Sequence, residues 1–251
     1  MTQTEKQKMM LTAPVEGLIC RMAVPTIISM LITALYNMAD TYFVGKLGSN
    51  AATGAVGVAL PLMAIIQATG FFFGHGSGNS ISRHLGAGDV EDAETLAVCG
   101  FAGAIGAGLI ICVLGQLFLE PLSLLLGSTA TILPYAKEYM RYILFAAPYM
   151  TAALVLNNQL RLQGNANFAM IGITSGAVLN VALDPLFIFT FDMGVAGAAA
   201  ATALSQLVSF VILLWALRRA GCVPLRFRYV RCMPSVMGQI FGGGLPSLVR
   251  Q

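Results

Sequence analysis

The sequence predicts an all-α polytopic membrane protein, and three observations lead to that fold class. Hydrophobic residues make up 57% of the 251 residues and charged residues only 10%, whereas charged residues make up about 25% of a soluble domain. Several almost uncharged runs reach the length of about 20 residues that a membrane-spanning helix needs. None of them alternates polar and apolar residues as the strands of a membrane barrel do, so we expect helices.

Six predicted spans follow one another along the chain. They are Met22–Ala39, Ala51–Gly74, Thr95–Leu119, Tyr142–Leu160, Phe168–Phe191 and Met193–Leu217. Glycine and alanine are frequent in them and allow helices to approach closely in lipid. We therefore expect a six-helix bundle over residues 1–217, a basic cytoplasmic linker over 218–234 and the truncated start of a second bundle over 235–251.

Basic residues gather on one side of the predicted membrane. That side carries Lys6, Lys8, Arg21, Arg83, Arg161, Arg218, Arg219, Arg226, Arg228 and Arg231, and the other carries Lys46, Lys137 and Arg141. Because cytoplasmic loops hold an excess of lysine and arginine, the N-terminus and the basic linker are predicted to face the cytoplasm. We expect a multi-pass protein of the plasma (inner) membrane.

Two connections between the predicted spans contain local structural signals. The glycine-rich stretch from His75 to Asp89 lacks the pattern of a phosphate-binding loop and follows no strand, so we interpret it as a cytoplasmic turn. Asp89 and Asp92 are typical of a helix start. The connection from Pro121 to Pro134 is expected to contain a short surface helix.

The first span holds a proline near its inner end and a carboxylate near its outer end. Pro25 removes a helical hydrogen bond and should bend the helix. Asp40 lies five residues before the predicted outer turn, which places it roughly 7–8 Å below the outer surface at about 1.5 Å per residue.

The fifth span carries the most informative motif, Asn180-Val181-Ala182-Leu183-Asp184-Pro185. Asn180 and Asp184 are four residues apart and share one helix face. Pro185 breaks the hydrogen-bond ladder next to them. A carboxylate at membrane depth costs about 2.5–3.5 kcal/mol on insertion scales and is a functional hypothesis by default.

Four side chains are predicted to meet at one depth, roughly 10 Å below the outer surface. They are Asp40, Asn180, Asp184 and Thr202 of the sixth span. Such oxygens suit a hard cation like Na⁺, or a proton shared by the carboxyls. Since no lysine or arginine lies at that depth, the counter-ion is predicted to be Na⁺, H⁺ or a cationic substrate. Tyr36, Tyr139 and Asn157 are further candidates to line a substrate cavity.

Five short motifs, in this order and spacing, resemble those of the MATE (multidrug and toxic compound extrusion) transporters. They run from Ala23 to Gly48, Ser82 to Asp89, Arg161 to Ala166, Asn180 to Pro185 and Met193 to Ala199. The resemblance implies two six-helix bundles around a cavity that opens alternately to each side. It also implies efflux of organic cations and drugs driven by inward Na⁺ or H⁺, with the first bundle's ion site at the four residues above.

The chain departs from that family in length, because MATE proteins have about twelve spans. Gly243-Gly244-Leu245-Pro246 echoes the Pro25 region of the first span, as a parallel repeat would. We therefore expect the missing C-terminal half of the same protein as a partner, besides the lipid bilayer and small cationic substrates. Neither an enzyme activity nor a cofactor beyond the coupling ion is expected, and no nucleic acid.

Three alternatives remain. An intramembrane aspartyl protease also uses two membrane carboxylates, but Asp184 lacks the preceding Gly-x-Gly of such enzymes. An exporter of a lipid-linked saccharide would bring basic residues into the cavity to meet phosphates, and the sequence places none there. The half chain could also be inert alone or work only as a homodimer.

Overall fold

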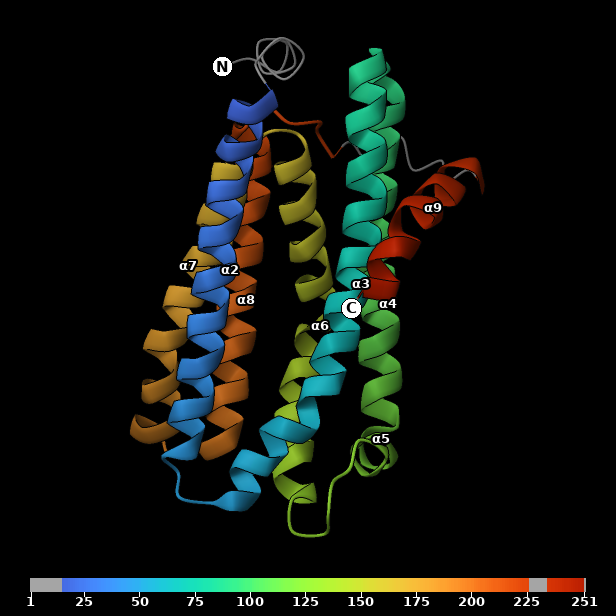
Figure 1. The fold of residues 1–251 in the computed structure, drawn as a ribbon. Coiled ribbons are helices and arrows are strands. Elements are labelled where there is room, and N and C mark those ends of the chain that lie inside the picture. The colour runs from blue at the N-terminus through green and yellow to red at the C-terminus, as the bar shows by residue number, and fades with distance from the viewer. Residues whose placement is uncertain (1–14, 226–233, 251) are drawn as a thin grey trace.

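The fold is known from a computed structural model that describes residues 15–225 and 234–250 (Figure 1). Within these residues six helices are long and apolar enough to cross a membrane, as predicted. They are α2 (Val15–Gly45), α3 (Asn50–Ala87), α4 (Val90–Leu117), α6 (Leu133–Leu162), α7 (Ala166–Pro185) with the π-helical turn η1 (Leu186–Thr190), and α8 (Gly194–Arg219).

Two further helices flank this bundle. α5 (Leu119–Leu125) is the short helix expected in the connection between the third and fourth spans. α9 (Pro234–Arg250) begins after the linker and packs on α3 and α4. Pro246 lies inside α9 as Pro25 lies inside α2. The linker residues 226–233 and the N-terminal residues 1–14 lie outside the described residues.

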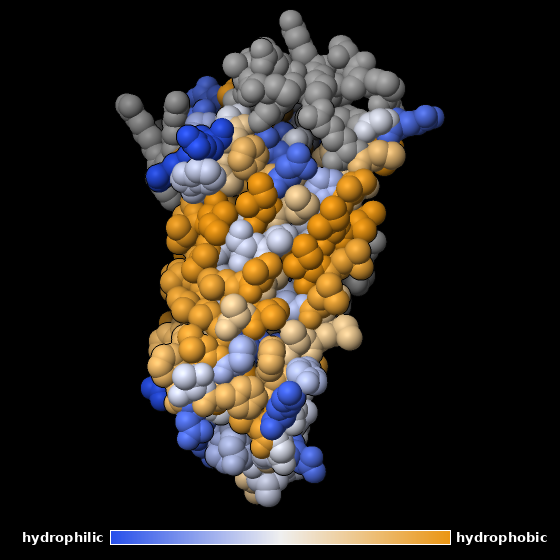
Figure 2. Space-filling view, turned by 90° about the vertical axis from the view of Figure 1, so that its left-hand side faces the viewer, coloured by the Kyte–Doolittle hydropathy of each residue, from blue (hydrophilic) through white to orange (hydrophobic). Residues whose placement is uncertain are grey.

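Successive spans run in opposite directions, which gives the bundle two distinct ends. We call the end where α2, α4 and α7 begin the upper end and the other the lower end (Figure 1). Hydrophilic side chains gather at both ends, with a broad apolar band between them (Figure 2). α2 contributes exposed apolar side chains such as Leu35 and Met38, which are 64% and 69% exposed. This band is the surface that a bilayer would cover.

The helix α6 forms the centre of the bundle. It contacts α3 and α4 on one side and α7 and α8 on the other (Figure 1). Within its most apolar stretch 67% of the residues are buried, compared with 6% for α2. The bundle is thus two groups of helices joined through α6, with α2 at the periphery against α7.

The prediction of a turn over His75–Asp89 is wrong. α3 continues to Ala87, and only Gly88, with a φ of 89°, and Asp89 separate it from α4. Glycine weakens a helix by about 1 kcal/mol relative to alanine, but here glycines allow neighbouring helices to approach. A Cβ atom at Gly76 would collide with the carbonyl of Ile240 in α9. Tertiary packing therefore outweighs the local signal for a turn. Asp89 stands at the N-cap of α4, as predicted, although its side chain makes no capping hydrogen bond.

The contact between α4 and α6 depends on a missing side chain at Gly108. A Cβ atom there would lie 2.7 Å from the Cα atom of Pro148 and 2.6 Å from Oγ1 of Thr151. Thr151 also donates a hydrogen bond of 2.9 Å to the carbonyl of Ala104 in α4. Backbone atoms cannot move aside as side chains can, so this contact admits only glycine.

We expect the substitution Gly108→Ala to destabilise the protein by about 1–3 kcal/mol, because the added methyl group would force α4 and α6 apart. Gly106→Ala is the matched control, since a Cβ atom at Gly106 meets nothing within 4 Å. Thermal unfolding of the purified protein in detergent measures both. Equal melting temperatures for the two variants would contradict this account of the contact.

Candidate ion site and the adjoining cavity

A cluster of polar side chains is buried near the lower end, between α2, α7 and α8. Asp184 is 0% exposed, Asn180 2%, Thr202 3% and Asp40 9%. Asp184 lies in the last turn of α7, while Thr202 lies about two turns into α8. Because α7 and α8 are antiparallel, residues near the end of one meet residues near the start of the other.

Asn180 joins the two helices. Its Nδ2 atom donates to Oδ1 of Asp184 over 3.4 Å and to Oγ1 of Thr202 over 3.2 Å. The first bond follows from the four-residue spacing on one helix. The second connects residues 22 positions apart and requires the tertiary structure. The amide group of Asn180 therefore keeps a carboxylate oxygen of Asp184 and the hydroxyl oxygen of Thr202 close to each other.

Several oxygens of this cluster have no hydrogen-bond partner within the described residues. They are Oδ1 of Asp40, Oδ1 of Asn180 and Oδ2 of Asp184. A buried polar atom without a partner costs about 1–3 kcal/mol, more when it carries charge. The ion pairs formed by residues 15–225 and 234–250 involve neither Asp40 nor Asp184. The cluster therefore offers acceptor oxygens and no protein cation, which is the donor set of a site for Na⁺ or for a proton.

Asp40 approaches this cluster from α2. α2 packs against α7, the helix that carries Asn180 and Asp184. Tyr36 lies four residues before Asp40, so the two side chains share one face of α2. Tyr139 is fully buried in the core. The four residues singled out for the ion site are thus buried on three helices, of which α7 contacts both others.

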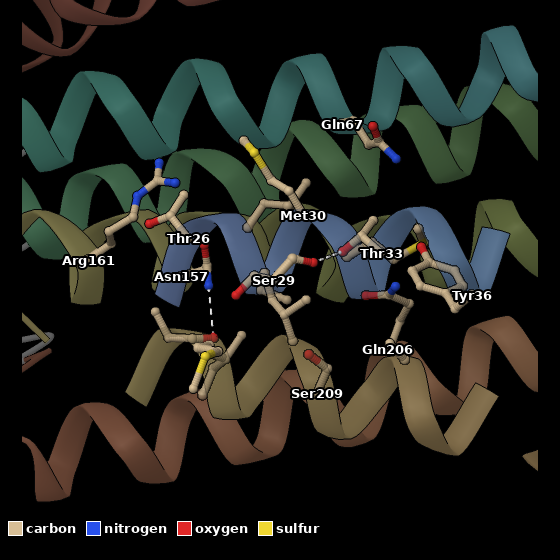
Figure 3. A pocket seen from close by; sticks show the side chains of 18 of the residues that line it. Thr26, Ser29, Met30, Thr33, Tyr36, Gln67, Asn157, Arg161, Gln206 and Ser209 are labelled. Atoms are coloured by element: carbon tan, nitrogen blue, oxygen red, sulfur yellow. Dashed lines mark hydrogen bonds between the residues drawn. The ribbon is translucent and has the colours of Figure 1, made fainter. Parts of the chain in front are cut away.

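A cavity of about 350 Å³ opens above this cluster. It lies between α2, α3, α6, α7 and α8, and its polar lining includes Thr26, Ser29, Thr33, Gln67, Gln206 and Ser209 (Figure 3). Methionine and alanine side chains supply much of the remaining wall. A cavity with mostly apolar walls and a few placed polar groups is typical of a site for a small organic molecule.

Two of the three residues predicted to line a substrate cavity line the cavity of the structure. Tyr36 and Asn157 line the cavity, and Asn157 donates from Nδ2 to the carbonyl of Ala169 over 3.1 Å. Tyr139 does not line it, because its side chain is packed into the core instead.

Pro25 lies inside α2, above the cavity-lining residues of that helix. Pro185 ends α7, and the chain continues as a π-helical turn, a feature frequent at functional sites.

The expectation that no basic residue enters the cavity is wrong. Arg161, in the last turn of α6, is the one charged side chain among the described residues that line it. Its position at a helix end suggested an ordinary surface charge. The direction in which it points depends on how α6 is rotated against α3 and α7, and a single sequence does not contain that rotation.

Six membrane-length helices, with a cavity between five of them and carboxylates buried near one end, define a polytopic membrane protein. The model of the MatE family matches residues 25–186, which is more than half of the chain. The chain therefore belongs to the MatE family, as its motifs suggested.

Relatives and solved structures agree with this assignment. The multidrug export protein MepA of Staphylococcus saprophyticus is 31% identical over 228 residues, which cover 90% of this chain and 51% of MepA. The crystal structure of MATE in the straight conformation matches with a TM-score of 0.89 and 31% identity, over 96% of this chain and 54% of that one. A MOP superfamily transporter from Pyrococcus furiosus, described as having a binding pocket of reverse polarity, matches with a TM-score of 0.87 and 32% identity, over 96% and 54%. The chain spans about half the length of the curated relatives it matches.

We expect Asn180→Ala to destabilise the protein by about 1–3 kcal/mol, because the substitution removes the link between α7 and α8 and leaves further buried oxygens unpaired. Ser175→Ala is the matched control, since Ser175 lies on the same helix and bonds only to its own preceding turn. Melting temperatures in detergent compare the two variants. A loss in Asn180→Ala no larger than in the control would show that the link contributes nothing.

Proposed function

We propose that this chain forms the N-terminal bundle of a secondary antiporter that exports organic cations and drugs in exchange for Na⁺ or H⁺. The observation that carries the proposal is the pair of buried carboxylates, Asp40 and Asp184, with no protein cation beside them in the described part of the chain. The similarity to a multidrug export protein supports the same reading.

The buried charge explains why a mobile cation is needed. Each carboxylate at membrane depth costs about 2.5–3.5 kcal/mol on insertion scales, and two near each other cost more because they repel. A Na⁺ ion held by Asp40, Asn180, Asp184 and Thr202, or a proton on one carboxyl, removes that cost. The site therefore has a strong affinity for a cation whenever it is accessible.

The helices that form the ion site also form the cavity. α2 carries Asp40 of the cluster and, one turn earlier, Tyr36 of the cavity wall. α7 carries Asp184 and, two turns earlier, Ala177 of the wall. A change in the position of either helix when an ion binds would thus alter the cavity directly.

Pro25 and Pro185 supply the places where these helices can change shape. Each proline removes one hydrogen bond from its helix, so bending there breaks fewer bonds than bending elsewhere. In our proposal the ion favours one shape of α2 and α7 and the substrate favours another. Coupling requires this difference, because a ligand with equal affinity for both shapes shifts no equilibrium.

The orientation follows the distribution of basic residues. Arg218 and Arg219 end α8 at the upper end of the bundle, which we place in the cytoplasm of a plasma membrane according to the positive-inside rule. The ion site then lies beneath the outer surface, where the inward gradient supplies the ion.

We expect Asp184→Asn and Asp40→Asn each to lower ion-driven export by about tenfold or more, because a loss of about 1.4 kcal/mol in ion affinity is a tenfold change. The measurement is efflux of a cationic dye from proteoliposomes that contain the full gene product, under separate Na⁺ and pH gradients. The gradient that drives efflux identifies the coupling ion.

Asp192→Asn is the matched control for these variants. Asp192 is an exposed carboxylate just beyond η1, with a φ of 53°, a conformation that asparagine also adopts. The substitution Asp192→Asn removes one negative charge, as the other two variants do, but leaves the buried cluster unchanged. We therefore expect this variant to export the dye at the full rate. If Asp184→Asn exports dye as fast as this control, the proposed coupling is wrong.

A further inference from the structure

The cavity contains one charged group that the proposed ion site does not use. Arg161 lies at the upper end of the cavity, beside Thr26, whereas Tyr36 and Gln206 lie toward the opposite end (Figure 3). Its side chain is half-buried. A guanidinium in a cavity of a membrane protein costs free energy unless something compensates its charge.

The described neighbours of Arg161 position it without neutralising it. Its Nη2 atom donates to Oδ1 of Asn158 over 2.6 Å and contacts Nε2 of His75 at 3.2 Å. Both partners are uncharged acceptors, and no carboxylate of the described residues lies within ion-pairing distance of the guanidinium. Since a guanidinium carries five N–H donors in a planar fork, donors remain for a ligand.

The same contacts fix the state of His75. A guanidinium cannot accept a hydrogen bond, so Nε2 of His75 must accept, and its proton must sit on Nδ1. That Nδ1–H group then donates to Oγ of Ser247 in α9 over 2.9 Å. The imidazole also stacks on the ring of Phe71, with centroids 5.3 Å apart. The neutral imidazole of His75, itself packed against Phe71, therefore positions the guanidinium of Arg161.

The surroundings of Arg161 suit an aromatic molecule. Phe71 lines the cavity and lies one turn from His75 on α3. The thioether side chains of Met30, Met150 and Met170 line the cavity as well. Methionine adapts to ligands of different shape and makes favourable contacts with aromatic rings. An anionic group at Arg161 would thus be attached to a flat apolar body.

The two ends of the cavity differ in charge. Tyr36 lies ten residues after Thr26 on α2, which is about 15 Å along the helix axis. Beyond Tyr36, one turn further along α2, lies the buried carboxylate of Asp40. The cavity therefore has a cation at its upper end and anions just beyond its lower end.

We propose that Arg161 determines specificity by binding the carboxylate of an amphipathic zwitterion, whose cationic group points toward Asp40. This inference rests on the proposed function, since it assigns a specificity-determining residue to the same cavity. Arg161 would distinguish ligands that carry a carboxylate at the end opposite their cation from ligands that lack one.

The test compares two dyes that differ by one charge, a rhodamine with a free carboxylate and its methyl ester. Their binding to the purified 251-residue chain is measured by fluorescence anisotropy in phosphatidylcholine nanodiscs, where no anionic lipid competes for Arg161. We expect the wild type to bind the zwitterion more tightly than the ester. Arg161→Gln should weaken zwitterion binding by about tenfold or more relative to ester binding, the effect of losing a charge-assisted hydrogen-bonded pair.

Two further variants make this test specific. Arg161→Lys keeps the charge and should restore part of the preference for the zwitterion. Arg83→Gln removes the same charge from an exposed position near the end of α3 and should leave the preference unchanged. If the wild type binds both dyes equally, or Arg161→Gln weakens both to the same extent, the proposal is overturned.

These outcomes are separate from those of the efflux experiment. Dye preference is measured at equilibrium without an ion gradient, whereas export of the ester depends on Asp184. Export that requires Asp184, together with a preference insensitive to Arg161, would overturn this inference alone. A preference that requires Arg161, together with export insensitive to Asp184, would overturn the antiport mechanism alone.

Discussion

The burial of carboxylates in a hydrocarbon environment is the constraint on which the rest of this structure depends. Asp184 is fully buried and Asp40 nearly so, and both lie in helices long and apolar enough to cross a membrane. A protein cation beside them would make the cluster a structural ion pair. The described helices provide none. In our proposal a cation that binds and leaves balances the charge, which makes the buried polar cluster a candidate transport site.

The architecture places this cluster where its occupancy can affect a cavity. α6 joins two groups of helices through its own packing, and close contacts such as that at Gly108 hold α4 against it. α2, by contrast, is little buried in the described structure. Among the membrane-length helices of the described residues, the one with the lowest buried fraction carries both Asp40 and part of the cavity wall. In our proposal this helix changes shape while the centre of the bundle stays packed.

The cavity of this chain differs in charge between its two ends. Similar proteins include a multidrug export protein and a transporter described as having a pocket of reverse polarity. In this chain the polarity is mixed, because Arg161 stands at one end while carboxylates lie beyond the other. In our proposal the charges of single residues at the two ends, more than the shared fold, select among ligands of similar size.

The sequence by itself determined the six spans and the pairing of Asn180 with Asp184, because helix length, hydropathy and four-residue spacing are local properties. It also indicated the depth of Asp40 and Thr202, since residues can be counted from a helix end. Only the tertiary structure decided that Thr202 bonds to Asn180, that Tyr139 packs into the core, and that Arg161 faces the cavity. It likewise decided that the segment after His75 continues a helix, since Ile240, which packs on Gly76, and Leu162, which packs on Gly78, are distant in the chain. The physical reason is the same in each case: the rotation of a helix about its axis is set by the side chains of its neighbours.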